Sequence, residues 1–443
     1  MTTDTPDQEV GLRAGKSLPR KPLGDECAEL ACIDRLWRMV LIAALCGVLL
    51  AVHAPPASAQ ADDPPTGPGW RVGTLSLTPT VIVTSGYDSN VNREAPRIAA
   101  RESYALPQLE LTWRTPRWLG VASTTHELTR LSGEEKGGVN WRGFGSLTFR
   151  GPHYKPYITY DRPRTNARPT GFEVGKRSVH LDDTLTAGVD VKATPRTTIG
   201  LKAQIDKTRW DADAAYAGSS LRETLNRDAK SASGSISYRL TPLTSLTGSA
   251  DVSQFRFVNS PARDATSQAA SAGVEFKSPA MIDGSASVGV YRFRQVQRAV
   301  TDFTGFAASS SLGYARPSGA YTRVEVSRNL TFSYDPNRAY FVLLGVNLSF
   351  SRPIGSKWHM VAFAGHHNID YPATLGGVRP RGNRLEDGGV AAAYQLGPWT
   401  RIGASLDNFI QTGQVGYSGF RSVAFLHIGI GSPRRLDRPI PLQ

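Results

Sequence analysis

Apolar and polar residues alternate along most of the chain after residue 70, and alternation is the period of a β-strand with one buried face. In Ser178–Lys192, for example, Val179 and Leu185 fall on one face while Asp182 and Asp190 fall on the other. The alternating segments run for about 12–16 residues, whereas strands of soluble proteins usually have about 5–6. Strands of this length predict a sheet that crosses a membrane rather than a soluble sandwich.

Eight prolines mark the tight turns that separate these segments, and an aromatic residue precedes seven of them by three or four positions. The seven pairs are Trp113/Pro116, Phe149/Pro152, Tyr238/Pro242, Phe276/Pro279, Tyr314/Pro317, Phe350/Pro353 and Tyr394/Pro398. Pro195 completes the series, with Val191 in place of the aromatic. Aromatic residues at one depth, followed by short turns, are typical of a transmembrane β-barrel.

The fold class predicted is therefore all-β, a transmembrane antiparallel β-barrel of about 18 strands. Each of the eight turns joins two strands, and one further strand is expected before them (Arg71–Ser85) and one after them (Phe420–Ile430). Long polar loops are expected on the opposite side, at Tyr87–Ser103, Asp161–Arg177, Lys207–Asp228 and Asp370–Asp387. In Gly284–Val296 the apolar phase changes between Val290 and Tyr291, which predicts a β-bulge.

Four regions are expected along the chain. Residues 1–59 form a signal peptide with an N-terminal extension, in which an apolar run of about 14 residues precedes the cleavage site Ala57-Ser58-Ala59 before Gln60. A signal anchor with a cytoplasmic tail is the alternative for this region. Residues 60–70 form a periplasmic linker, 71–431 the outer-membrane barrel and 432–443 a basic tail. All three cysteines precede the cleavage site, as suits a chain that crosses an oxidising periplasm.

The charge of the chain is basic. Residues 1–59 hold 6 of the 51 Lys and Arg and 7 of the 38 Asp and Glu, so the remainder carries 45 against 31, a net +14. These basic residues are dispersed over predicted strands and loops rather than clustered, which argues against a nucleic-acid partner.

The polar phase of the predicted strands supplies the candidate functional residues. Assigning the apolar phase to lipid predicts these pore-lining residues: Arg142, Arg150, Lys192, Lys202, Arg239, Arg323, Arg401, Asp182, Asp190, Asp206, Glu325 and Asp407. Inward Lys and Arg favour anions, so a weak anion preference is expected. The alternative is that mixed charges hydrate the lumen and brace its wall by pairing.

The first predicted strand closes with Gly86-Tyr87-Asp88-Ser89-Asn90-Val91-Asn92. A barrel that opens with this segment resembles the β-barrel porin families of Gram-negative outer membranes, and more weakly the barrel of surface-lipoprotein assembly modifiers. The resemblance implies an outer-membrane barrel. Within the segment, Asp88, Asn90 and Asn92 could bind Ca²⁺, but a turn in which Asp and Asn bond their own backbone is favoured.

No enzymatic activity, cofactor or metal is expected. His366 and His367 adjoin Asp370, but neighbouring strand residues face opposite ways, so the two imidazoles would not converge. No Gly-x-Ser-x-Gly or His-Glu-x-x-His motif accompanies the remaining histidines.

The function expected is passive diffusion of small solutes across the outer membrane. The partners expected are the lipid bilayer, lipopolysaccharide and the barrel assembly machinery. The alternatives are an export conduit for exopolysaccharide or protein, and a plugged surface scaffold or adhesin. The plugged form would be favoured if Phe144, Tyr157, Phe341 and Phe409, all inward by phase, packed together.

Overall fold

The computed structural model describes residues 69–91, 97–132, 138–166, 178–216, 218–277, 281–295, 302–335, 338–371, 382–413 and 419–431. All of them belong to one unit, Gly47–Gln443. Within these ranges no helix is long and apolar enough to cross a membrane. The predicted regions 1–59 and 432–443 lie outside the described residues.

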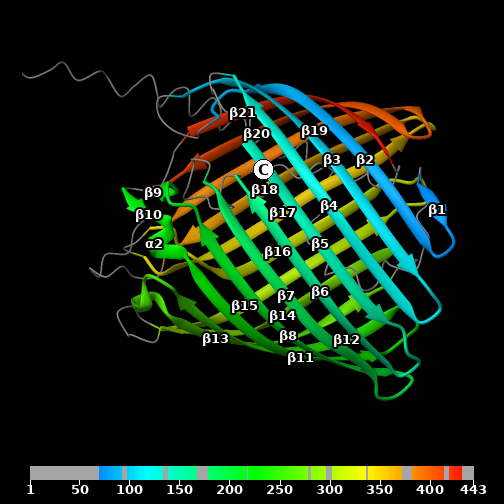
Figure 1. The fold of residues 1–443 in the computed structure, drawn as a ribbon, viewed down its shortest axis with the longest axis vertical. Helices are drawn as coiled ribbons and strands as arrows, with labels where there is room; N and C mark the ends of the chain where they lie inside the picture. The colour runs from blue at the N-terminus through cyan, green and yellow to red at the C-terminus, as the bar shows by residue number, and fades with distance from the viewer. Residues whose placement is uncertain are drawn as a thin grey trace, which may run out of the picture. The chain divides into compact units, whose positions relative to one another are not determined.

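The described chain is a meander of long antiparallel strands (Figure 1). The strands are β1 (Trp70–Val72), β2 (Leu75–Asp88), β3 (Ala100–Arg114), β4 (Trp118–Leu131), β5 (Gly138–Phe149), β6 (Tyr154–Thr165), β7 (His180–Lys192), β8 (Thr197–Trp210), β9 (Ala215–Tyr216), β10 (Ser219–Ser220), β11 (Arg227–Arg239), β12 (Thr244–Phe257), β13 (Ala265–Phe276), β14 (Ile282–Gln295), β15 (Phe303–Ala315), β16 (Tyr321–Phe332), β17 (Tyr340–Ile354), β18 (Trp358–Asp370), β19 (Asn383–Gly397), β20 (Thr400–Thr412) and β21 (Gly419–Ile430). Two short helices, α2 (Leu221–Leu225) and the 3₁₀ turn η1 (Pro261–Arg263), lie in connections.

The sheet closes on itself because the first long strand pairs with the last. β2 pairs with β21 from Val81↔Ile430 to Asp88↔Val423, and every other neighbouring pair follows chain order. The sheet holds nineteen strands, and leaving out the three-residue β1, which pairs only with β2, gives a closed barrel of eighteen. The predicted fold class and strand number are confirmed.

Short connections lie at one end of the barrel, here called the turn end, and long ones at the other, the loop end. Six of the eight predicted prolines (Pro116, Pro152, Pro195, Pro242, Pro317 and Pro398) fall in the short connections. Pro353 is instead the second-last residue of β17, where it pairs with His359, and Pro279 lies outside the described residues.

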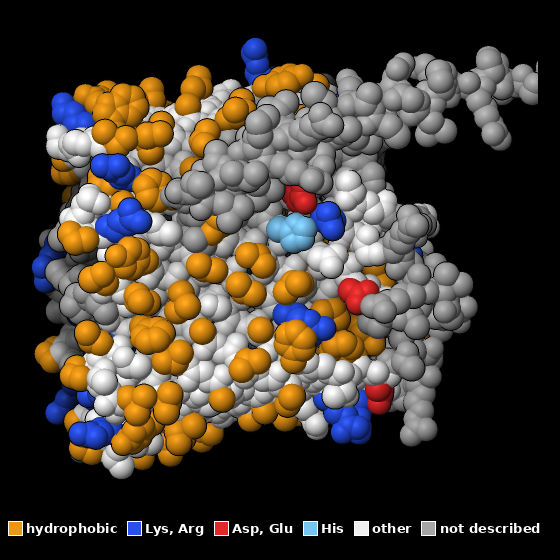
Figure 2. Space-filling view, turned by 180° about the vertical axis from the view of Figure 1, so that it is seen from behind, with side chains coloured by type: hydrophobic (Ala, Val, Ile, Leu, Met, Phe, Trp, Pro, Cys, Tyr) orange, Lys and Arg blue, Asp and Glu red, His pale blue; other side chains and the backbone are white. Residues whose placement is uncertain are grey.

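The outward face of the barrel is apolar, because one phase of each strand carries exposed residues such as Leu201, Val288 and Leu426. Figure 2 shows these apolar side chains spread over the visible wall, with Lys and Arg gathered toward the turn end on the left. All seven predicted aromatics share the outward phase near the turn end. Several touch neighbouring rings, as Phe149 does with Trp118 at a centroid distance of 5.0 Å. The aromatic girdle expected from the sequence is therefore present.

Three details predicted from the sequence are wrong. The first predicted strand is divided into β1 and β2 by a turn at Gly73, whose φ of 60° is left-handed. β14 shows no bulge, because its register with β13 is unbroken from Gly284 to Gln295. The strands also continue for several residues into the predicted loops, as β8 does to Trp210.

Candidate functional site

The inward face of the barrel wall is polar. Eleven of the twelve residues predicted to line a pore lie in strands, on the phase opposite to the exposed apolar side chains, and Arg150 directly follows β5. Lys192 and Arg239 are exposed at strand ends, whereas Arg401 and Asp407 are buried, at 6% and 1% exposed. That these residues line an open pore stays a prediction.

Charge on the inward phase changes along the barrel axis. In the described strands, nine carboxylates stand seven or more residues from the turn end, against three guanidinium groups, Arg142, Arg227 and Arg421. We call these carboxylates the loop-end band: Asp88, Glu102, Glu127, Asp161, Asp182, Asp206, Asp251, Asp387 and Asp407. The sequence-based prediction had included only three of the nine, because it gave the inward phase mainly to basic residues.

Nearer the turn end the balance reverses. Within five residues of that end the inward phase carries seven basic side chains: Arg114, Lys155, Lys192, Lys202, Arg239, Arg323 and Arg401. It also carries five carboxylates: Glu110, Asp190, Glu275, Asp283 and Glu325. Over the described strands, then, fourteen inward carboxylates stand against ten Lys and Arg.

Several inward charges are paired across neighbouring strands. Arg142 donates two hydrogen bonds of 2.7 Å to the carboxylate of Asp161, in the bidentate geometry that suits this pair. At the turn end Arg323 donates to the Tyr321 hydroxyl, which in turn donates to Asp283 Oδ1 at 2.8 Å. These contacts brace the wall, as the alternative interpretation of the inward charges predicted.

Aromatic residues gather against the inner face of the wall at the loop end. We define the mouth cluster as Trp210, Phe255, Phe257, Phe293, Phe332 and Tyr340. Trp210 and Phe257 also pack with the buried Leu221 and Leu225 of α2. Phe332 is central, since its ring lies 5.0–5.7 Å from those of Phe255, Phe257 and Phe293. Arg227 also lies over the Phe332 ring, 5.4 Å from its centroid.

This cluster forms because the tip of the β16–β17 hairpin leaves the wall. β16 pairs with β15 only as far as Ala308↔Arg328, although β16 itself continues to Phe332. Beyond Arg328 the outward-phase Phe332 and Tyr340 pack on inward-phase residues of β12 and β14. Since one face of the tip meets the inner face of other strands, the tip is folded into the lumen.

The extent of this folding follows from the strand order. Tyr334, just after β16, lies 5.8 Å from Trp210 at the end of β8, and six strand steps separate β8 from β16 in the wall. At about 4.8 Å per step, that path measures about 29 Å along the sheet. The contact is therefore made across the interior, and the tip narrows the lumen at the loop end.

A guanidinium group holds the tip in place. Arg263 of η1 donates to the backbone carbonyl oxygens of Ser333 and Arg338, at 2.6 and 3.1 Å. The Arg263 guanidinium group also lies over the ring of Phe257, 5.6 Å from its centroid. No local pattern predicts this arrangement, because the residues that meet are 70–76 positions apart in the chain.

The opening motif lies at the seam where the barrel closes. Arg421 of β21 forms a bidentate pair with Asp88, with distances of 2.7–3.0 Å, and the two side chains are 6% and 0% exposed. Asn90 donates its backbone N–H to Asp88 Oδ1 at 2.9 Å, so the turn interpretation of the motif is confirmed. Gly86 faces the ring of Phe425, and a Cβ there would overlap that ring and the Ala424 carbonyl. Asn92, the third residue of the Ca²⁺ alternative, lies outside the described residues.

The outward phase at the loop end carries the opposite charge. We call the following twelve side chains the outer girdle: Arg101, Arg130, Arg162, Arg164, Lys207, Arg209, Lys230, Arg256, Arg292, Arg294, Arg328 and Arg384. Four outward carboxylates accompany them in the described strands: Asp183, Asp228, Asp370 and Glu386. Arg328, for example, lies 4.1 Å from the centroid of the exposed Phe306 ring.

The remaining sequence candidates are dispersed. His366 and His367 approach different carboxylates, Glu386 at 3.5 Å and Asp387 at 3.2 Å, and their phases are opposite, as predicted. Among the described residues no group of three or more His, Cys, Asp and Glu could hold a metal ion. Of the four inward aromatics in the plug hypothesis, Phe341 packs with Ile369 and Tyr371, and Phe409 lies under Arg421.

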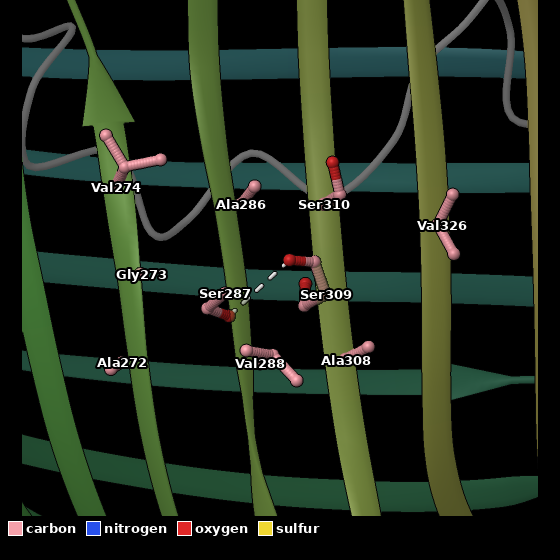
Figure 3. A pocket seen from close by; sticks show the side chains of 10 residues that line it. All are labelled: Ala272, Gly273, Val274, Ala286, Ser287, Val288, Ala308, Ser309, Ser310 and Val326. Carbon is pink, nitrogen blue, oxygen red and sulfur yellow. Dashed lines mark hydrogen bonds between the residues drawn. The ribbon is translucent and has the colours of Figure 1, made fainter.

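The surface depressions do not provide a solute site. One, of about 280 Å³, is lined by small side chains of β13–β16 such as Ala286 and Ala308, beside the exposed Val288 (Figure 3). A second, of about 430 Å³, lies among Leu111, Leu147 and Tyr160. Both open on the outward, apolar face.

Comparison with known proteins agrees with this architecture. Residues 160–349 match the family model described as "Putative beta-barrel porin 2". The predicted porin resemblance is confirmed. The chain is therefore similar to porins over these residues, and a porin-like barrel is a fold of the outer membrane.

Three of the solved structures that match this chain are distant from it in sequence. A BenF-like porin from Pseudomonas fluorescens Pf-5 is 8% identical with a TM-score of 0.47, and the match covers 81% of this chain and 99% of that chain. OpdK from Pseudomonas aeruginosa is 9% identical with a TM-score of 0.46, covering 80% and 99%. OpdQ from the same organism is 10% identical with a TM-score of 0.46, covering 81% and 97%. A search of curated proteins finds no match.

Proposed function

We propose that this porin-like protein is a channel through which small solutes diffuse passively across the outer membrane. The observation that carries the proposal is a closed wall of eighteen strands whose inner face is polar and charged. Barrels of 16–18 strands enclose an aqueous lumen rather than a packed core. Solutes would pass by electrostatic and steric filtering, with no chemistry required of the wall.

The loop end faces the cell exterior and the turn end the periplasm in this proposal. Short periplasmic turns and longer extracellular loops are the usual arrangement of such barrels. The outer girdle supports it, since twelve outward Lys and Arg would meet the phosphate groups of lipopolysaccharide. Delivery through a signal peptide cleaved before Gln60, and insertion by the barrel assembly machinery, belong to the same proposal.

The weak anion preference predicted from the sequence has less support. Its premise was a surplus of inward Lys and Arg, and the described strands carry fourteen inward carboxylates against ten inward Lys and Arg. The positive charge of the chain lies to a large extent on the outward phase.

The folded-in tip of the β16–β17 hairpin supports a second candidate function, the plugged surface scaffold. A mouth narrowed by the mouth cluster and α2 is also what a plugged surface scaffold would have. The two functions differ in conductance, because a plugged lumen passes no ions.

Single-channel recording on the refolded chain from Gln60 in a planar bilayer tests the proposal. Folding is first verified by the heat-dependent shift in gel mobility that intact barrels show. Steady openings are expected. A correctly folded barrel that stays silent over the accessible voltage range would contradict the channel and support the scaffold.

A further inference from the structure

We propose that the channel prefers cations, and admits small zwitterions by their cationic group, although the chain as a whole is strongly basic. This inference rests on the proposed channel function and names the class of solute that the channel favours. Two independent features carry it: the sign of the charge on the loop-end wall, and the narrowing of the lumen at the same depth.

The loop-end wall is negative even after its ion pairs are set aside. Arg142 pairs with Asp161 at 2.7 Å and Arg421 pairs with Asp88 at 2.7 Å, so each pair can be counted as neutral. Because nine carboxylates stand against three guanidinium groups in the described strands, the loop-end wall carries an excess of negative charge however these groups pair with one another. Rings of inward carboxylates select cations in channels.

Two carboxylates below the mouth cluster, Asp206 and Asp251, accept hydrogen bonds from neutral donors. Asp206 Oδ1 accepts hydrogen bonds from the Thr184 hydroxyl at 2.8 Å and the Gln204 amide at 2.9 Å. Asp251 Oδ1 accepts from the Ser253 hydroxyl at 3.0 Å. Because hydroxyl and amide donors fix a carboxylate without neutralising it, the negative charge still acts on the lumen.

Because the tip narrows the lumen at this depth, the charges here have the largest effect on ion selectivity. Trp210 and Phe257 stand at the loop ends of β8 and β12, the strands that carry Asp206 and Asp251 only four to six residues below. Walls of one charge sign with a low-dielectric backing focus the field in a narrow passage. Ions crossing this passage therefore encounter the loop-end band at close range, whereas the turn end is not narrowed by the tip.

The positive charge of the chain does not oppose this preference. The outer girdle lies on the other face of the same strands, where salt screens exposed charges within about 8 Å at physiological ionic strength. The basic side chains of the turn end lie beyond the narrow mouth. They would attract the anionic group of a zwitterion, while its cationic group still faces the loop-end band.

The reversal potential in a KCl gradient tests the proposal, measured on the refolded chain from Gln60 with heat-modifiability as the check on folding. A cation-leaning value is expected. The double variant Asp206→Asn/Asp251→Asn should lower the cation-to-anion permeability ratio, and Ser231→Asp, which adds an inward carboxylate at the loop end, should raise it. Asp190→Asn is the matched control, because Asp190 is also inward but stands two residues from the turn end.

An anion-leaning reversal potential would overturn this inference and leave the channel in place. An equal effect of the double variant and of Asp190→Asn would also overturn it, because selectivity would then not be set at the loop end. Silence from a folded barrel would overturn the proposed channel and this inference together.

Discussion

The two faces of the barrel wall at the loop end carry opposite charge, although they belong to the same strands. Over the described strands the outward face there bears twelve Lys and Arg against four carboxylates, while the inward face bears three Arg against nine carboxylates. Adjacent residues such as Asp206 and Lys207 of β8 therefore face different environments, the lumen and the outside of the barrel. The period of a strand, two residues, makes this separation possible.

The comparison shows why a net charge describes a barrel poorly. In a globular protein most charges meet the same solvent, so their sum has physical meaning. In a barrel one phase meets lipid headgroups and the other meets the lumen, and the two populations have to be counted separately. The pI of about 9.7 sums both faces, so we infer lumenal selectivity from the inward charges alone.

The largest effect is expected at the seam, where an inward charge is fully buried. Asp88→Ala leaves Arg421 buried without its carboxylate, and breaking such a pair costs about 3–5 kcal/mol. The urea midpoint for loss of the folded, slow-migrating form should fall accordingly. Asp161→Ala is the control, because its partner Arg142 is 58% exposed and its loss should cost less than about 1 kcal/mol. Equal midpoints for the two variants would contradict the assignment of Asp88 as the closure of the barrel.

The second effect is expected at the β16–β17 tip, which narrows the lumen. Arg263→Ala removes hydrogen bonds from a charged donor, each worth about 1.5–3 kcal/mol, and frees the β16–β17 tip. Single-channel conductance should rise and cation preference should weaken as the mouth widens. Arg256→Ala, on the outward phase of β12, is the matched control and should leave both unchanged. An unaltered conductance in Arg263→Ala would show that the tip does not limit the passage.

The barrel wall was predictable because its signals are local. Strand period, proline turns and the aromatic girdle each repeat every few tens of residues, and pairing along a meander follows chain order. Eighteen strands could therefore be counted without knowledge of any long-range contact. The misplaced boundaries have local causes as well: Gly73 adopts a left-handed turn inside an apolar run, and strands extend past the membrane where both faces become polar.

The mouth and the seam were not predictable in the same way. Tyr291 and Phe293 suggested a change of phase, since the apolar phase was assigned to lipid, but they remain inward and pack with Phe303 and Tyr340. The partner of Asp88 lies 333 residues away. No periodicity identifies such a contact, because it depends on closure of the whole sheet.

A third and smaller effect is expected when only the outer face is altered. Arg292→Gln/Arg328→Gln removes two cations of the outer girdle, and each cation near an anionic membrane surface is worth about 1 kcal/mol. Stabilisation of the refolded barrel by added lipopolysaccharide should decrease, as measured by the thermal midpoint with and without the lipid. The reversal potential should not change. A shift in ion selectivity would contradict the separation of the two faces.

The smallest effect is expected for an exposed ion pair on the outer face, in contrast to the buried pair at the seam. Arg162 and Asp183 approach to 3.2 Å on the outward phase of β6 and β7, with side chains 43% and 27% exposed. Pairs of this exposure contribute about 0.2–1 kcal/mol, because water and salt screen them. A double-mutant cycle with Arg162→Gln and Asp183→Asn should therefore give a coupling energy several-fold below that of Arg421 with Asp88, decreasing further at high salt. A coupling as large as that of the seam would mean that the outward phase is shielded from water at this depth, and the outer girdle would then lie within the membrane rather than at its surface.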